Sequence, residues 1–213
     1  MSRTRRVRTR TARVLLGGVV AIAAVAATAA TSSPAPAAGV DLPPARLAAL
    51  KQRFDPLVKP LGLRVTRGML QNLETYEEDP QGTHLALYVE PIAPDYSDAR
   101  YVTSFTKLTH MLVPVVFDRW TGLESFDICQ EPVDDTREVP PPTTQIFVAR
   151  SALDRVGSWK TATLTELLGA SPRARSISAG YYVYFSPELR DDPRFARAAA
   201  KAGWTTASTA YGH

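Results

Sequence analysis

The sequence predicts an α+β fold, a two-layer sandwich in which helices pack on a mainly antiparallel sheet of about five strands. Two segments, 84–92 and 123–131, alternate apolar and polar residues, which is the pattern of half-buried strands. A long amphipathic helix pattern over 97–120 separates them. Other strand patterns follow one another through turns or loops, so strict alternation of strand and helix is not expected.

The first elements predict a helix followed by a hairpin. Residues 45–62 repeat leucine and phenylalanine at helical spacing, begin after a proline pair that the first turn of a helix tolerates, and end at a glycine. Residues 63–76 are extended in character, and the acidic turn 77–82 leads into the alternating strand 84–92. We expect the two extended segments to pair as an antiparallel hairpin.

The long helix over 97–120 contains Pro114, which removes one backbone donor and predicts a kink. Gly122 fits the end of this helix. The later elements are expected to be a strand over 123–131, a polar, proline-rich loop over 131–142, a strand over 145–150, a helical segment over 151–170 broken at 157–158, a strand over 177–185 and an alanine-rich helix over 191–202.

The first 38 residues have the three parts of a secretory signal peptide. Residues 1–13 hold six arginines and no acid, and residues 14–30 form an uncharged, apolar run. Ala35-Pro36-Ala37 places small residues at the third and first positions before a cut after Ala37. The expected organisation is a signal peptide over 1–38, a linker over 39–44, a single α+β domain over 45–204 and a loose C-terminal tail over 205–213.

A retained membrane anchor is the alternative interpretation of the leader. Its apolar run is 17 residues long and mostly alanine, just under the roughly 20 residues that a spanning helix needs. Length and flanks therefore favour cleavage, and no membrane contact is expected of the mature chain. The location predicted is extracytoplasmic, either secreted or in the cell envelope, and the preference for arginine over lysine favours a bacterial, GC-rich genome.

The charge of the chain is concentrated in the leader. The whole sequence has 25 Lys+Arg against 21 Asp+Glu. Six arginines and no acids leave with the leader, so the mature chain carries 25 − 6 = 19 basic and 21 acidic residues, a net charge of −2. Nucleic acid is therefore not an expected partner. The expected partner is an unknown protein or a small-molecule ligand in the envelope.

The chain holds one cysteine, Cys129, so no intramolecular disulfide can form. A nucleophilic role would need a cation or helix N-terminus nearby, whereas Asp127 and Glu131 flank it; a structural cysteine is the favoured interpretation. The three histidines, His84, His110 and His213, lack metal-ligand spacing, and no cofactor is expected. The sequence contains no G-x-S-x-G, phosphate-binding glycine loop or H-E-x-x-H motif.

The densest patch of site-like side chains lies between the long helix and the strand after it. The predicted ligand-binding residues are Arg119, Trp120, Asp127, Cys129 and Glu131. The alternative is structural: Trp120 packs in the core, and Arg119 pairs with Asp118 or another nearby acid. As acids on one strand, Asp127 and Glu131 would have Cα atoms about 13 Å apart, too far for a direct catalytic pair unless their side chains converge.

Two functions remain open from the sequence. The leading hypothesis is an exported, non-enzymatic binding or interaction module, because the leader, the near-neutral mature charge and the missing catalytic motifs agree with it. The alternative is a small extracytoplasmic hydrolase that acts on cell-wall or carbohydrate material through carboxylates such as Asp127 and Glu131. No catalytic residue is assigned. A third possibility, a protein tethered at the membrane surface, requires that the leader is retained.

Overall fold

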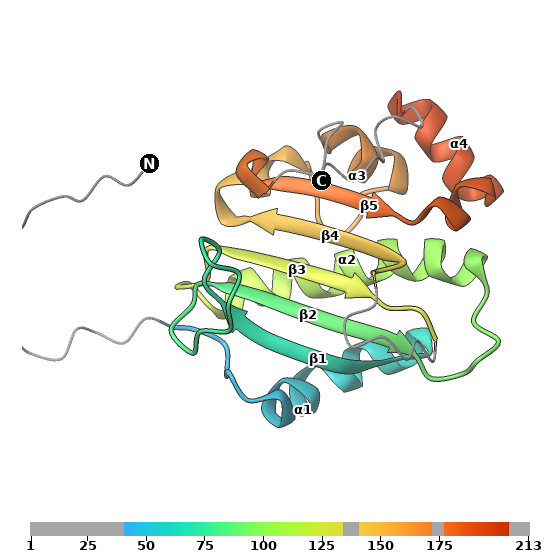
Figure 1. Cartoon of the computed structure of the whole chain (residues 1–213). Helices are drawn as coiled ribbons and strands as arrows, with labels where there is room; N and C mark the ends of the chain where they lie inside the picture. Colours follow the sequence, from blue (N-terminus) through green and yellow to red (C-terminus); the bar gives the residue numbers. More distant parts are fainter. Residues whose placement is uncertain (1–40, 134–140, 172–176, 205–213) are drawn as a thin grey trace, which may run out of the picture. The chain divides into compact units, whose positions relative to one another are not determined.

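The structure is a computed structural model that describes residues 41–133, 141–171 and 177–204. The expected signal peptide and the expected C-terminal tail lie outside these residues. Within them, a five-stranded mixed sheet carries helices, which confirms the predicted α+β sandwich (Figure 1). In the part of the chain that the structure describes, no helix is both long and apolar enough to cross a membrane.

The strands lie in the sheet in the order in which they occur in the sequence. Every neighbouring pair is antiparallel except β2 and β3, which are parallel because the long helix α2 carries the chain back between them. The predicted hairpin is confirmed as the β1–β2 pair. The strands are β1 (Leu63–Gln71), β2 (His84–Pro91), β3 (Ser125–Gln130), β4 (Thr144–Ala149) and β5 (Tyr181–Phe185).

The helices bury their apolar stripes against one face of this sheet. α2 contributes Phe105, Leu108 and Leu112 to the same core cluster as Phe126 of β3 and Ile146 of β4. This helix continues through Pro114, which lies inside it. The helices are α1 (Leu47–Val58), α2 (Asp98–Arg119), α3 (Leu164–Ala170) and α4 (Pro193–Ala202), and the short 3-10 helices are η1 (Lys59–Leu61), η2 (Arg150–Arg155), η3 (Ile177–Ala179) and η4 (Pro187–Asp191).

Local sequence decides where two expected elements end. β1 stops at Gln71 instead of continuing to Tyr76, because the chain turns back and Gln71 pairs with Glu78 in an isolated bridge. The helical segment expected over 151–170 divides into η2 and α3. α3 begins anew at Thr163, whose side chain forms a reciprocal capping box with Glu166.

The opposite face of the sheet carries a different set of side chains. Strand alternation places His84 and Tyr88 of β2 beside Ser125, Asp127 and Cys129 of β3 on that face. Phe147 and Gln145 of β4 lie across from Asp127 and Cys129. All of these except Tyr88 are buried, yet none belongs to the core cluster under the helices. The sheet therefore has an apolar helix-covered face and a buried, partly polar second face.

Candidate functional site

The structure separates the predicted site residues into two groups. Trp120 is buried and packs edge-on against the ring of Phe54 in α1, with ring centroids 5.9 Å apart. Arg119, at the end of α2, is exposed and lies 3.7 Å from the carboxylate of Asp41. Trp120 therefore serves packing between α1 and α2, and Arg119 forms a surface ion pair with Asp41.

Asp127 and Cys129 come together on the second face of the sheet. Cys129 Sγ lies 3.9 Å from Asp127 Oδ2, and the same carboxylate oxygen accepts a 2.6 Å hydrogen bond from Gln145 Nε2 of β4. Gln145 is a residue that the sequence analysis missed. Its pairing with Cys129 across β3 and β4 follows from strand register, which the sequence pattern alone does not supply.

His84 continues this polar row at the other end of β3. Its Nδ1 forms a 2.9 Å hydrogen bond with Ser125 Oγ, and its Nε2 lies 3.8 Å from Asp127 Oδ1. The ring stacks on Phe147, and burial lowers the pKa of His84 to about 4. His84 is therefore a neutral, packed histidine at physiological pH. The 3.8 Å separation is too long for the hydrogen bond that would make Asp127 orient a catalytic base.

Glu131 follows β3 and faces the first strand. Its two carboxylate oxygens accept hydrogen bonds from Arg67 and from Thr66 Oγ1, the latter at 2.8 Å. Arg67 also lies over the ring of Tyr88, 4.2 Å from its centroid. Burial raises the pKa of Tyr88, and the charges of Cys129, Asp127 and Glu131 raise it further against the opposing effect of Arg67. These contacts tie β1, β2 and the end of β3 together, so Glu131 has an evident structural role.

A pocket of about 670 Å³ opens at the end of the sheet where β3 and β5 finish and α2 begins. We call it the tyrosine–proline pocket. Its lining includes three charged residues, Asp98, Glu188 and Arg190. Its walls include Tyr96, Tyr101, Tyr184, Pro94, Pro132, Pro141, Pro142 and Pro187.

The hydroxyls of Tyr96 and Tyr101, two of the three tyrosines in the pocket wall, bond to the backbone of the protein. Tyr101 donates to the Glu131 carbonyl and Tyr96 to the Leu61 carbonyl, both at 3.1 Å. Burial raises the pKa of Tyr101 to about 12 and raises the pKa of Tyr96 as well. Hydrogen bonds from its own backbone and from Ser186 lower the pKa of Glu188. At neutral pH Tyr96 and Tyr101 therefore stay protonated and Glu188 stays ionised, so the pocket combines neutral aromatic rings with a negative charge.

Within 41–133, 141–171 and 177–204, no group of three or more His, Cys, Asp or Glu side chains is placed to hold a metal ion. No family model, no curated protein and no solved structure matches the chain.

Proposed function

We propose that this chain is an exported, non-enzymatic binding domain that holds a small, largely apolar ligand in the tyrosine–proline pocket. The composition of the pocket carries the proposal. Small-molecule sites in proteins are concave, mostly apolar, have volumes of roughly 300–1,000 Å³ and use a few polar groups for orientation. A 670 Å³ pocket lined by prolines and tyrosines together with three charged residues has these properties.

The rigidity of the walls supports binding at low entropic cost. Proline has a fixed φ angle and no side-chain rotamers to lose, and tyrosine has only two χ angles. Tyr96 and Tyr101 are further held by an edge-to-face contact, with ring centroids 4.9 Å apart. Walls of this kind lose little conformational freedom when a ligand binds, so more of the contact energy remains as affinity.

The leader supports export of this domain. A basic segment, an apolar run and small residues before a cut are the features that direct a chain out of the cytoplasm. N-terminal sequencing of the protein recovered from a secreting bacterial host should give a mature chain beginning at or near residue 38 or 39. A chain that begins before Ala30 would instead indicate a retained anchor.

The hydrolase alternative stays a prediction that the observed contacts do not favour. Asp127 is hydrogen-bonded to Gln145, and Glu131 is hydrogen-bonded to Arg67 and Thr66. A glycosidase needs one carboxylate as an acid and another as a base or nucleophile, on either side of the substrate bond. Substituting both acids by alanine should abolish activity if this alternative is right.

A thermal-shift screen of apolar and aromatic small molecules, with sugars, nucleotides and metal ions as contrasting classes, tests the binding proposal. A ligand present at 100 times its Kd adds about 2.7 kcal/mol to the free energy of unfolding, which is visible as a raised Tm. Val133, half-buried in the pocket wall, provides the key variant, Val133→Trp, which should fill the space. Val115→Trp, at an exposed position of α2 outside the pocket, is its matched control.

We expect an apolar ligand to raise the Tm of the wild type and of Val115→Trp by the same amount. Val133→Trp should remain folded and lose most of that increase. An apolar ligand that stabilises Val133→Trp as strongly as the wild type would overturn the placement of the site. A panel in which no apolar compound stabilises the wild type would overturn the proposal itself.

A further inference from the structure

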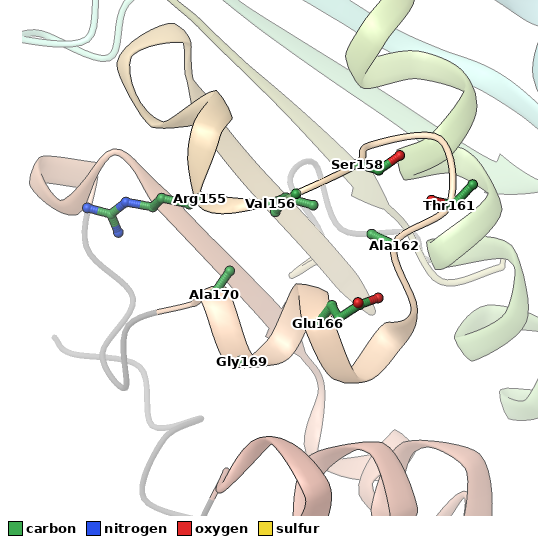
Figure 2. A pocket seen from close by; sticks show the side chains of 9 residues that line it. Arg155, Val156, Ser158, Thr161, Ala162, Glu166, Gly169 and Ala170 are labelled. Carbon is green, nitrogen blue, oxygen red and sulfur yellow. The ribbon is translucent and has the colours of Figure 1, made fainter.

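A second pocket, of about 530 Å³, lies between the end of η2 and α3 and shares no lining residue with the tyrosine–proline pocket (Figure 2). We call it the glycine cleft. Its lining includes two glycines, Gly157 in the loop and Gly169 in α3, together with Arg155, Ser158, Thr161 and Glu166. Because glycine has no side chain, the wall of this cleft is bare backbone at these two positions.

Neither glycine is required by the local fold. Neither has a positive φ, and a Cβ added at Gly157 or at Gly169 would meet no atom within 4 Å. Five other glycines of the described chain have a reason in the structure, either a positive φ or a close neighbour that leaves little room for a side chain: Gly62, Gly68, Gly82, Gly180 and Gly203.

Gly169 carries an energetic cost that the fold does not explain. It lies inside α3, where glycine is less stable than alanine by roughly 0.5–1 kcal/mol. A residue that breaks a local rule without a structural gain marks a position where function is expected. At Gly169 and Gly157 the effect of glycine is the same, because each leaves the cleft open.

The polar groups around the cleft indicate the class of ligand. Figure 2 shows Arg155 and Glu166 coming from different elements, on different sides of Gly169 and Ala170 in this view. Hydrogen bonds from Thr163 lower the pKa of Glu166, so its carboxylate is ionised at neutral pH. The lining of the cleft thus includes a cation, Arg155, and an anion, Glu166, from different elements. It also includes the hydroxyl residues Ser158 and Thr161 and the bare backbone of the two glycines.

We propose that the glycine cleft binds a short peptide with free termini. Arg155 would pair with the terminal carboxylate, since guanidinium groups match carboxylates in geometry and charge. Glu166 would pair with the terminal ammonium. The two glycines would let the peptide planes approach the wall closely, and the two hydroxyls would bond the peptide's backbone groups. An apolar ligand, as expected in the tyrosine–proline pocket, would leave these polar groups without partners.

The test is affinity selection from a synthetic pool of tripeptides, with bound peptides identified by mass spectrometry. The full chain, purified after export, is incubated with the pool bearing free termini and, separately, with the same pool acetylated at the N-terminus and amidated at the C-terminus. Gly169→Leu should block the cleft, and its Cβ would meet no atom within 4 Å. Thr165→Leu, on the same helix but outside the lining, is the matched control.

We expect the wild type and Thr165→Leu to retain tripeptides with free termini, and to retain the blocked pool at least tenfold less. Gly169→Leu should retain at least tenfold less of the free pool while its Tm is equal to or above that of the wild type. Glu166→Gln, which can keep the capping hydrogen bonds, should weaken retention by a similar factor. No enrichment by the wild type, or equal enrichment by folded Gly169→Leu, would overturn the proposal.

Discussion

Asp55 of α1 accepts a hydrogen bond from the backbone N–H of Val65 in β1, with 2.8 Å between Oδ1 and N. β1 is an edge strand, and exposed edge donors invite pairing with another chain. Ser171 has the same relationship to the other edge, because its hydroxyl accepts from the N–H of Val183 in β5 at 3.0 Å. At each edge of the sheet, a side-chain oxygen thus accepts a hydrogen bond from a backbone N–H group.

Asp55→Ala should therefore destabilise the protein by about 1–2 kcal/mol, because it leaves a part-buried backbone donor without its partner. The variant should also self-associate more readily at high concentration. Urea unfolding and concentration-dependent light scattering measure the two effects. Asp55→Asn keeps an acceptor oxygen and should recover most of the stability; equal losses in both variants would show that this hydrogen bond is not the cause.

Protonation of His84 should make stability depend on pH between about 4 and 6.5. The folded pKa is about 4 against 6.5 in the unfolded chain, so the unfolded state binds more protons in this window. The free energy of unfolding should then fall as pH decreases through the window, by about 3 kcal/mol at pH 4. Denaturant unfolding at pH 7, 5.5 and 4 provides the measurement.

His84→Asn is the comparison for that experiment. Asparagine removes the titrating group and can still hydrogen-bond to Ser125. The difference between the wild type and this variant isolates the histidine, because other titrating groups are common to both. Parallel pH profiles of the two proteins would mean that the buried histidine is not the source of acid sensitivity.

Removing Arg67 and removing Glu131 should destabilise the protein by different amounts. The Glu131 side chain is 6% exposed and that of Arg67 is 28% exposed. Arg67→Ala leaves a buried carboxylate without its cation and should cost about 3 kcal/mol, whereas Glu131→Ala leaves a partly solvated cation and should cost less. The double variant should lose less than the sum of the two single variants. Glu90→Ala, in the more exposed Arg64–Glu90 pair, should cost under about 1 kcal/mol.

The predicted fold came largely from patterns within single segments. Alternation over 84–92 and 123–131 and the apolar stripe over 97–120 each lie in one stretch of chain, and they correspond to β2, β3 and α2. The same alternation correctly placed Asp127 and Cys129 on one face, opposite Phe126 and Ile128.

Contacts between distant segments could not be predicted in this way. The hydrogen bond between His84 and Ser125 spans 41 residues and depends on the parallel register of β2 and β3. Trp120 is next to Arg119 in sequence, yet it is buried against Phe54 while Arg119 is exposed. The tyrosine–proline pocket is formed by segments from residue 94 to residue 190, none of which carries a recognisable motif alone.

Alanine at two glycine positions should have opposite effects on stability. Gly169→Ala should raise the free energy of unfolding by about 0.5–1 kcal/mol, because its backbone is helical and the space is open. Gly203 ends α4 with a φ of 71°, so Gly203→Ala should lower the free energy of unfolding. Thermal unfolding of both variants measures this contrast. A loss of stability in Gly169→Ala would show that the fold itself needs this glycine.

The binding proposal is tested most directly by mapping where the apolar ligand identified in the thermal-shift screen contacts the protein. Backbone amide NMR spectra are recorded as this ligand is titrated into the isotope-labelled, exported chain. We predict that the largest shift changes cluster at Thr143, Tyr184 and Leu189, in the wall of the tyrosine–proline pocket. Changes centred on Ser158 and Thr161, or on the second face at Asp127, with the pocket residues unaffected, would contradict the account.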